Sequence, residues 1–363
     1  MRYKYLLFLL ATVLSAMHTN AGAQNVTESR TLQKSFEARE GMSLDITNKY
    51  GKVHLSPSKN DSVYIRIELN ASASNKQKLR KLVDGVSFNL AASNHYIIAE
   101  TKFSSGPANL IESIRTLTNN LISSGSRLVV DYYVAAPEFM VINLDNRYGD
   151  IYIESTDADL NISASNGVIK GEDLWGNNKF DLNFCNISIG SVKQAQVKIS
   201  YGELNIERGD MVDIRSSSSK IELGDIESLV SDSRRDRFFI KKVSSIEGSA
   251  YFTDYTIDLL SEKLNLNTRY GKLRVEQIPY IFKLISVEST YTDIYLTADN
   301  ETAFELDARL TSCYSSIPEE WVIEETTLSA ERDEYLYSGQ VGSSPKSKII
   351  LKMTRGNLDF MQN

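Results

Sequence analysis

One phrase recurs along this chain and constrains its fold more than any other feature. It is an alternating segment, a polar corner that usually ends in Tyr-Gly, and a second alternating segment. Clear copies read LDITNKYGKVHL from Leu44, LDNRYGDIYI from Leu144, VKISYGELNI from Val197 and LNLNTRYGKLRV from Leu264. Period-2 alternation of β-branched and aromatic residues indicates strands. The glycine indicates a corner at which the backbone takes an unusual conformation or approaches another segment closely.

Weaker copies of the phrase set its period. We expect corners near Gly149, Gly167, Cys185, Gly202, Ser219, Arg235, Gly271, Thr292 and Cys313. One more corner, near Thr253, has to be assumed to complete the series. The seven intervals from Gly149 to Gly271 then average about 17.4 residues, and a period just under 20 residues is typical of a solenoid.

The expected fold is all-β: a single-chain parallel β-solenoid of about 17–20 residues per rung, with a small N-terminal α+β elaboration. Stacking would bury apolar faces that are too small to be stable alone. The expected inward residues include Ile151, Ile153, Leu204, Ile206, Ile221 and Leu223. A sandwich of hairpins is the alternative, although Asn166-Gly167 is the only two-residue hairpin signal among these segments. Handedness is not written in the sequence, and right-handed crossovers are the default.

The expected organisation has four parts. Residues 1–23 are a signal peptide, and 24–141 hold the first rung and an α+β capping insertion. Residues 142–317 are the rungs, and 318–363 are an acidic loop with closing strands. In the insertion we expect strands at 63–70, 86–90, 96–101 and 127–135 and helices at 75–83 and 108–122. A cap is expected because open solenoid ends expose unpaired strand edges.

The first 23 residues resemble an export signal. Arg2 and Lys4 precede an apolar run from Tyr5 to Ala16, and Ala21-Gly22-Ala23 supplies a small-x-small cleavage site. A membrane anchor is the alternative, but the run is shorter than the roughly 20 residues that span a bilayer. No cysteine follows it, so no lipid anchor is expected. We therefore expect export to the periplasm or cell surface, with no integral membrane segment in the mature chain.

Composition and motifs argue against several classes of function. The formal net charge of −7 is wrong for a general nucleic-acid binder, which needs a cationic surface. Beyond the signal only His54 and His95 remain, a poor inventory for imidazole catalysis or a multi-histidine metal site. Nucleophile-elbow, zinc-protease, phosphate-loop and dinucleotide motifs are missing from the sequence. We expect no cofactor, no catalytic residue and no metal site.

The tyrosines of the corners are the candidate ligand-binding residues: Tyr148, Tyr201, Tyr270 and Tyr291, with Tyr314 nearby. A ladder of such rings could stack on sugars and offer a hydroxyl for hydrogen bonding. Alternatively, the rings only support neighbouring rungs. Asn48 and Asn146, two residues before a corner tyrosine, are expected to hydrogen-bond within the corner.

Three other groups have a functional and a structural interpretation. Cys185 and Cys313 would lie seven rungs and roughly 34 Å apart. Because bridged Cα atoms lie within about 7 Å, we expect no disulfide and two buried free thiols. The acidic segment 318–335 lacks calcium-loop spacing and is expected to be a solvated loop. The turn Arg234-Arg235-Asp236-Arg237 could bind a polyanionic glycan or lipopolysaccharide phosphate, or be a corner with local Asp pairing.

The order of these features resembles a known family. It consists of a signal peptide, the VYIRIE strand followed by a helix, a strand ending in Ala135-Ala136-Pro137, and Asn-x-Tyr-Gly-x-Ile rungs. This resembles the "putative adhesin" β-solenoid family of unknown function that is common in Bacteroidota, over about residues 44–360. The resemblance implies an exported parallel β-solenoid and brings no catalytic residues. The expected helix at 108–122 is a departure, being longer than the family pattern.

The leading hypothesis is a non-catalytic binding, adhesin-like or structural module of the bacterial envelope. Its partners would be envelope or host glycans or envelope proteins, and not nucleic acid. The alternative is a carbohydrate-active β-helix, a polysaccharide lyase or hydrolase, which needs clustered carboxylates or calcium with a nearby base. The two differ in whether outward carboxylates on adjacent rungs converge. Asp150, Glu203 and Lys272 follow equivalent corners, but they are not all acidic. A periplasmic folding or signalling accessory remains open.

Overall fold

The computed structural model describes residues 25–104 and 126–362. These residues are nearly all-β, as expected, with eighteen strands hydrogen-bonded in one sheet and one helix. The expected signal peptide at 1–23 and the expected helix at 108–122 lie outside the described residues. The elements are β1 (Val26–Glu37), β2 (Ser43–Lys49), β3 (Val53–Pro57), β4 (Ser62–Ala73), α2 (Lys76–Asp84), β5 (Val86–Ala92), β6 (Tyr96–Phe103), β7 (Arg127–Ala136), β8 (Val141–Arg147), β9 (Ile151–Ile153), β10 (Asp159–Ser200), β11 (Glu203–Ser217), β12 (Lys220–Arg234), β13 (Arg237–Ile278), β14 (Leu284–Ala298), β15 (Phe304–Ser316), β16 (Val322–Ser329), β17 (Glu334–Val341) and β18 (Ser347–Gln362).

The chain divides into two compact units. The described residues of the smaller unit are 25–31, 68–87, 102–104 and 126–129, and they include helix α2. Asn75 caps this helix by accepting a hydrogen bond of 2.9 Å from the Lys78 N–H at its side-chain oxygen. Leu79, Leu82 and Val83 form its buried face. The helix expected at 75–83 is therefore present, and the four strands expected around it correspond to β4, β5, β6 and β7.

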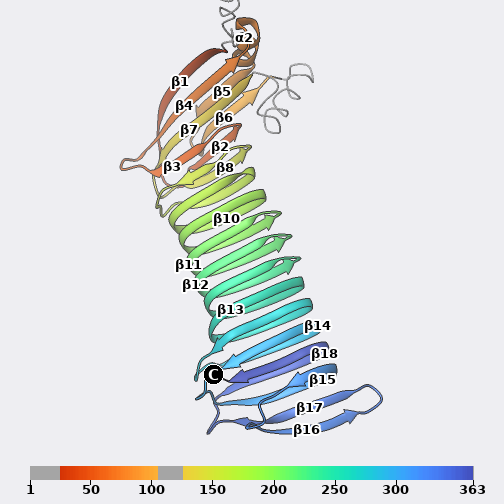
Figure 1. Ribbon diagram of the computed structural model, residues 1–363. Coiled ribbons are helices and arrows are strands. Elements are labelled where there is room, and N and C mark those ends of the chain that lie inside the picture. Colours follow the sequence, from red (N-terminus) through yellow and green to blue (C-terminus); the bar gives the residue numbers. More distant parts are fainter. Residues whose placement is uncertain (1–24, 105–125, 363) are drawn as a thin grey trace, which may run out of the picture. The chain divides into compact units, whose positions relative to one another are not determined.

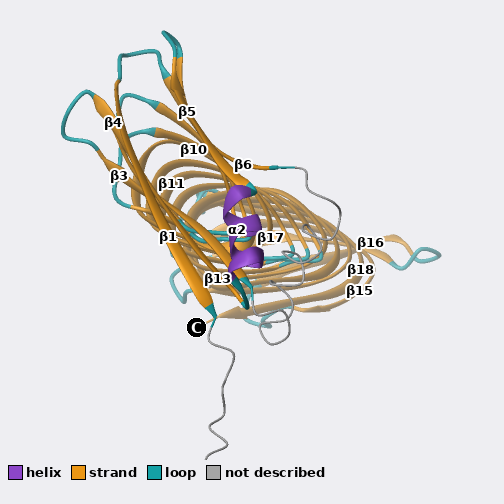
Figure 2. Ribbon diagram, turned by 90° about the horizontal axis from the view of Figure 1, so that it is seen from above, coloured by secondary structure: helices purple, strands orange, loops and turns teal. Residues whose placement is uncertain are grey.

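The larger unit comprises 32–67, 88–101 and 130–362 and carries the repeats. Neighbouring strands from β10 to β13 pair in parallel at a constant offset of 17 residues, so that Glu203 lies beside Asn186 and Lys220 beside Glu203. Figure 1 shows these repeats following one another, and the view from above shows them as nested curves (Figure 2). The strand pairs β10–β11, β11–β12, β12–β13 and β13–β14 are all parallel, which is not the pairing of a sandwich of hairpins.

The first copy of the phrase joins the same series across a long stretch of sequence. Strand β2 pairs in parallel with β8, with Ser43 beside Val141, and β3 pairs with β9, with Val53 beside Ile151. The segment between β3 and β8 is thus an insertion between two adjacent repeats. The alternating apolar pattern at both sites makes this pairing possible, because both repeats bury their apolar side chains on the same face.

The core consists of the inward side chains of successive repeats. The six residues expected to point inward are each at most 3% exposed. Full burial of such a side chain stabilises a fold by about 1.5–3 kcal/mol. The core residues in question are Ile151, Ile153, Leu204, Ile206, Ile221 and Leu223.

In each Tyr-Gly corner the tyrosine and the glycine have different structural roles. The tyrosine takes the left-handed backbone conformation, with φ of 59° at Tyr148 and 56° at Tyr201. The glycine allows a close approach, because a Cβ at Gly202 would lie 2.0 Å from the carbonyl oxygen of Cys185 in the preceding repeat. The corner that had to be assumed near Thr253 is present, with a φ of 55° at Phe252.

The C-terminal segment is ordered differently from the expectation. Strand β18 lies between β14 and β15 and pairs in parallel with both, so the last copy of the phrase is inside the stack. Segment 318–335, expected as a solvated acidic loop, instead supplies β16 and the beginning of β17, which form an antiparallel hairpin whose second strand pairs with β15. Its β-branched residues favour strand, while its carboxylates, such as Glu324 and Glu325, stay exposed to water.

Strand β1 is the element that the sequence pattern does not reveal. It pairs with β4. Its residues VTESRTLQKSFE are mostly polar and exposed, so they lack the apolar alternation that marks a half-buried strand.

Candidate binding surface

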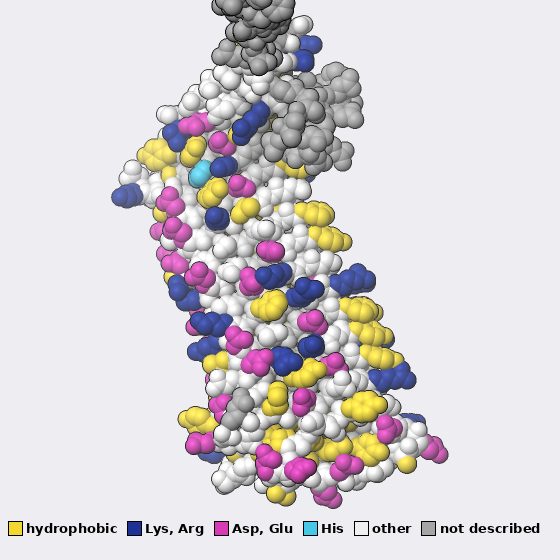
Figure 3. All heavy atoms as spheres, viewed as in Figure 1, with side chains coloured by type: hydrophobic (Ala, Val, Ile, Leu, Met, Phe, Trp, Pro, Cys, Tyr) yellow, Lys and Arg dark blue, Asp and Glu magenta, His cyan; other side chains and the backbone are white. Residues whose placement is uncertain are grey.

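The left-handed corner residues of the larger unit form a column, which we call the corner column. Consecutive strand pairs place these residues in successive repeats, one beside the next. Figure 3 shows hydrophobic side chains in a line along this edge, interrupted by Lys or Arg side chains. In spatial order the column is Tyr50, Tyr148, Asn166, Phe184, Tyr201, Ser218, Arg235, Phe252, Tyr270, Tyr291, Arg355 and Ser312.

The rings of the column stack in three separate groups. The first is Tyr50 with Tyr148, at 5.5 Å between ring centroids, and the second is Phe184 with Tyr201, at 5.1 Å. The third runs from Phe252 to Tyr270 at 4.7 Å and on to Tyr291 at 5.1 Å, with the Arg355 guanidinium over the Tyr291 ring. These separations match the roughly 4.8 Å between strands, so the stacking follows directly from the parallel register.

Several of these rings are exposed although the backbone there disfavours bulky residues. The Phe184 and Tyr201 side chains are 59% and 58% exposed. A non-glycine residue in this conformation costs on the order of 1 kcal/mol, and Asn is one of the few residues that tolerate it well. Asn166 and Ser218 occupy the same position in other repeats, so the corner can form without a ring. Exposed rings at this position are consistent with contact to a ligand.

The four predicted tyrosines all lie on the corner column, but they do not form one ladder. Tyr270 and Tyr291 stack on each other, whereas Tyr148 stacks on Tyr50 and Tyr201 on Phe184. Tyr314, suggested as a neighbour, is off the column, two residues beyond the corner residue Ser312.

Sequence reasoning missed four members of the stacks. Phe184 and Phe252 could have been found from the sequence, because each lies 17 or 18 residues from a corner tyrosine. Tyr50 stands at the corner of the first copy of the phrase, but its neighbour in the column, like that of Arg355, depends on a long-range pairing, across 98 residues for Tyr50 and 64 for Arg355.

The asparagines before the corners have the expected role. Asn146 is fully buried, and its Nδ2 donates to the carbonyl oxygens of Gly149 at 3.0 Å and Gly51 at 3.3 Å. Asn48 Nδ2 donates to the Val130 carbonyl at 3.0 Å. Each asparagine therefore donates to a backbone carbonyl of another segment, and Asn146 also to one of its own corner.

The two cysteines are free. Cys185 is buried, as expected, while Cys313 is only half-buried. Burial raises the pKa of both thiols. Each Sγ lies near the carbonyl two residues earlier, at 3.3 Å for Cys185 and 3.4 Å for Cys313, so the thiols act as small corner residues.

The turn at Arg234–Arg237 is a corner with local pairing of its aspartate, which was one of its two interpretations, although the partners are backbone N–H groups and a hydroxyl and not a guanidinium group. Asp236 points inward and is 2% exposed. Its carboxylate accepts hydrogen bonds from the backbone N–H groups of Ser219 at 2.7 Å and Arg234 at 2.8 Å, and from the Ser216 hydroxyl at 2.8 Å. Burial raises the pKa of Asp236 despite these bonds. The three arginine side chains remain exposed.

A second surface is a polar groove of about 600 Å³ on another face of the same unit. Its polar side chains bond to one another: Asn143 Nδ2 donates to Asp45 at 2.6 Å and Asn161 Nδ2 to Asn143 at 2.9 Å. Lys198 forms an ion pair of 3.1 Å with Asp181. Two of the four carboxylates that line the groove, those of Asp45 and Asp181, therefore have partners within it.

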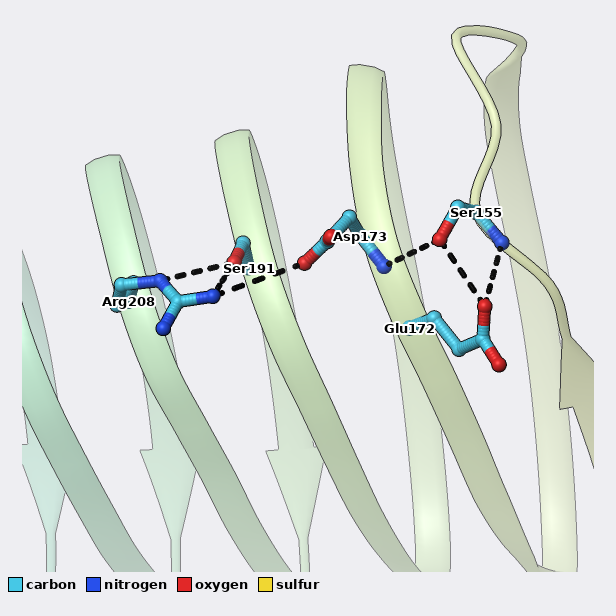
Figure 4. A network of polar contacts seen from close by, with 5 residues as sticks. All are labelled: Ser155, Glu172, Asp173, Ser191 and Arg208. Carbon is cyan, nitrogen blue, oxygen red and sulfur yellow. Dashed lines mark hydrogen bonds and ion pairs between the residues drawn. The ribbon is translucent and has the colours of Figure 1, made fainter.

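Polar ladders also tie repeats together at other positions. In Figure 4, the Glu172 carboxylate accepts hydrogen bonds from the N–H and hydroxyl of Ser155. Arg208 donates to the Ser191 hydroxyl at 2.8 Å and lies 4.0 Å from the Asp173 carboxylate. The hydrogen bonds join residues of neighbouring repeats and the Arg208–Asp173 contact spans two repeats, so this network stabilises the stack and needs no ligand to explain it.

One histidine belongs to an aromatic stack. The His54 ring lies between Tyr133 and Tyr152, at 4.8 Å from each ring centroid. Partial burial lowers its pKa, against the opposing effect of Asp131. Burial between the two rings therefore favours the neutral form of His54.

The described residues contain no group of three or more His, Cys, Asp or Glu side chains placed to hold a metal ion. In 25–104 and 126–362, no helix has the length and apolar character needed to cross a membrane.

The outward carboxylates that follow the corners do not converge. Asp150 and Glu203 hold equivalent positions in different repeats, and by the corner spacing Val168 and Asn186 lie between them. Lys220 is the next neighbour of Glu203. This column therefore does not supply the carboxylate pair that a glycosidase needs.

These features define a class: a nearly all-β repeat protein with parallel neighbouring strands and aromatic residues at its corners. The family comparison agrees with this class. The chain belongs to the family described as Toastrack DUF4097, whose match covers residues 42–359.

Solved structures with remote similarity carry related descriptions. A "putative adhesin" from Parabacteroides merdae is 11% identical, with 73% of this chain and 95% of that chain covered and a TM-score of 0.33. A "putative adhesin" from Parabacteroides distasonis is 10% identical, covering 91% and 97%, with a TM-score of 0.29. A "putative lipid binding protein" from the same species is also 10% identical, covering 93% and 96%, with a TM-score of 0.29. No curated protein matches the chain.

Proposed function

We propose that this chain is an exported, single-chain parallel β-solenoid that acts as a non-catalytic binding module of the bacterial envelope. In this proposal 1–23 are a signal peptide, 24–141 the first rung with an α+β cap, 142–317 the rungs and 318–363 the closing segment. The constant 17-residue parallel offset supports the solenoid. The binding surface is the corner column, with Tyr148, Tyr201, Tyr270 and Tyr291 among its contact residues.

The observation that carries this function is the exposure of rings at strained corner positions. Phe184 and Tyr201 are more than half exposed on a backbone that favours Asn or Gly. Internal stacking supports the repeats, but it does not require that an outer ring surface remain open to water. An extended polymer with sugar rings at intervals near 5 Å could stack along such a column, because aromatic faces pack well on apolar sugar faces.

The test is a polysaccharide-binding assay of the purified protein with product analysis. We expect at least one envelope or host polysaccharide to bind without cleavage. Tyr201→Ala and Tyr270→Ala should each weaken binding by about three- to tenfold, as expected for loss of one stacking contact. Tyr314→Ala is the matched control, since that exposed tyrosine lies off the column, and it should bind like the wild type.

The enzyme hypothesis makes the opposite prediction in the same assay. New reducing ends or unsaturated products would replace the binding-module proposal with a carbohydrate-active β-helix. Equal binding by all three tyrosine variants would show that the column is only structural. If an envelope protein binds and no glycan binds, the partner of the binding module is a protein and not a polysaccharide.

A further inference from the structure

The corner column has one interruption that is also cationic. Between the rings of Tyr201 and Phe252 the column carries Ser218 and then Arg235, so one side of the Tyr201 ring faces a position without a ring. Two repeat steps separate Tyr201 from Arg235, which is about 10 Å along the stack. That distance leaves room for one inserted ring at the spacing that the column's own rings adopt.

A groove of about 570 Å³ lies at this interruption. Tyr201 and Arg235 line it on either side of Ser218. The other lining residues are Asn186, Gly202, Glu203, Ser219, Lys220 and Arg237. We call this groove the Ser218 slot.

The slot has an excess of positive charge in an acidic protein. It contains Lys220, Arg235 and Arg237 but only one carboxylate, that of Glu203. Lys220 has an ion pair of 2.6 Å with Glu222. Among the described residues, Arg235 and Arg237 have no ion-pair partner. The Asp236 carboxylate points inward and accepts hydrogen bonds from Ser216, Ser219 and Arg234, so it does not pair with a guanidinium group. The side chains of Arg235 and Arg237 are exposed to solvent.

We propose that the Ser218 slot binds one acidic sugar residue of a polysaccharide, stacked on Tyr201 with its carboxylate at Arg235 and Arg237. A ring is needed to fill the space beside Tyr201, and an anion is needed to match the guanidinium groups, which form paired hydrogen bonds with carboxylates. This inference rests on the proposed function and names the class of ligand that the same column selects. The other ring-free position, Asn166, is not part of this cationic groove.

The test uses oligogalacturonate as the probe, with a neutral galactose oligomer of equal length and poly-glutamate as comparisons. Calorimetric titration of the full-length protein should give tighter binding of oligogalacturonate than of either comparison. Ser218→Tyr should fill the slot and weaken binding by about tenfold or more, and Arg235→Gln about tenfold, as expected for loss of a charge-assisted hydrogen bond. Asn166→Tyr adds the same ring at the other gap and should change binding less than threefold. Lys198→Gln, which removes a positive charge from the polar groove, should also bind like the wild type.

The outcomes separate this inference from the proposed function. If acidic and neutral oligomers bind equally and Ser218→Tyr binds like the wild type while Tyr201→Ala is impaired, the column binds glycans but the slot assignment is wrong. If poly-glutamate binds as tightly as oligogalacturonate, the site recognises charge without a ring, and the proposal is overturned. If no oligomer binds, the slot assignment is overturned, while the proposed function is decided by the polysaccharide-binding assay. Thermal unfolding of each variant checks folding, and tyrosine is tolerated at equivalent corners, as Tyr201 and Tyr270 show.

Discussion

At the scale of single residues, each Tyr-Gly corner depends on two different departures from ordinary backbone geometry. The tyrosine accepts a left-handed conformation, while the glycine allows a neighbouring repeat to approach within a distance that excludes a Cβ. At other corners Ser219, Asp236 or Thr253 takes the glycine's place, and these side chains form hydrogen bonds within the stack. The position after the left-handed residue is therefore occupied in two ways: by glycine, which has no side chain, or by a polar residue whose side chain forms hydrogen bonds.

Glycine at this position predicts a strong effect of adding one methyl group. Gly202→Ala would place a Cβ 2.0 Å from the backbone oxygen of Cys185, which cannot move without shifting a strand. We expect a loss of about 1–3 kcal/mol in the free energy of unfolding, typical of overpacking a tight site. Ser219→Ala, at an equivalent corner that already holds a Cβ, should cost no more than about 1.5 kcal/mol for its lost hydrogen bond. Urea unfolding midpoints compare the two, and a Gly202→Ala variant as stable as Ser219→Ala would contradict the close-approach role.

Asp236 predicts a pH dependence of stability. Burial raises its pKa in the folded protein above the ordinary value of 3.8, so the folded chain binds this proton more tightly than the unfolded chain. The free energy that this tighter proton binding adds to folding is fully present below pH 3.8. It is lost as the pH rises through the raised folded-state pKa of Asp236. Asp236→Asn cannot ionise and lacks this dependence. Melting temperatures from pH 7 to pH 4 should show the wild type gaining stability relative to Asp236→Asn as the pH falls. A difference that is constant with pH would contradict the raised pKa.

At the scale of elements, the position of β18 is the least expected feature. It separates β14 from β15, so both strands depend on a segment that is synthesised after them. The β16–β17 hairpin, in contrast, pairs only with the far side of β15. The two segments should therefore differ in how much the fold depends on them.

Deletion of each segment tests this difference. A chain ending at residue 346 lacks β18 and leaves unpaired edges on both β14 and β15, so we expect loss of soluble folded protein. Replacing 322–340 with a short Gly-Ser linker removes the outer hairpin, keeps the buried Trp321, and should preserve the strand signal in circular dichroism. Soluble yield and circular dichroism measure both. A stable, soluble chain ending at 346 would show that β18 is not needed between its neighbours.

These elements also show how far sequence reasoning reaches. Alternation identified the core positions such as Ile151 and Leu204, and the period located even the assumed corner at Phe252, because both signals are local. Strand β1 was missed because its exposed polar residues carry no alternation. The insertion of β18 was missed because the order of parallel strands depends on pairing between distant segments. The Ser218 slot was missed although its corners follow one another at the local 17-residue period, because the sequence pattern does not show which side chains around a corner line a groove.

At the scale of the larger unit, the repeats convert one local corner into a surface with a regular spacing. Each parallel step moves the corner by about 4.8 Å, so aromatic and cationic side chains that are 17 residues apart in sequence become neighbours. A surface of this kind suits a polymer whose own units repeat at a similar distance. Several weak contacts along one molecule can then add up to useful affinity.

The most direct test of a polymer-binding corner column is the dependence of affinity on ligand length. Oligosaccharides of increasing length, prepared from a polysaccharide that binds, would be titrated calorimetrically into the wild type and into Tyr201→Ala, with reducing ends measured after each titration. We predict that wild-type affinity rises with each added sugar until the oligomer spans the column, that the variant shows a smaller rise, and that no new reducing ends form. An affinity that is the same for the shortest and longest oligomers, or the appearance of cleavage products, would contradict a non-catalytic binding column.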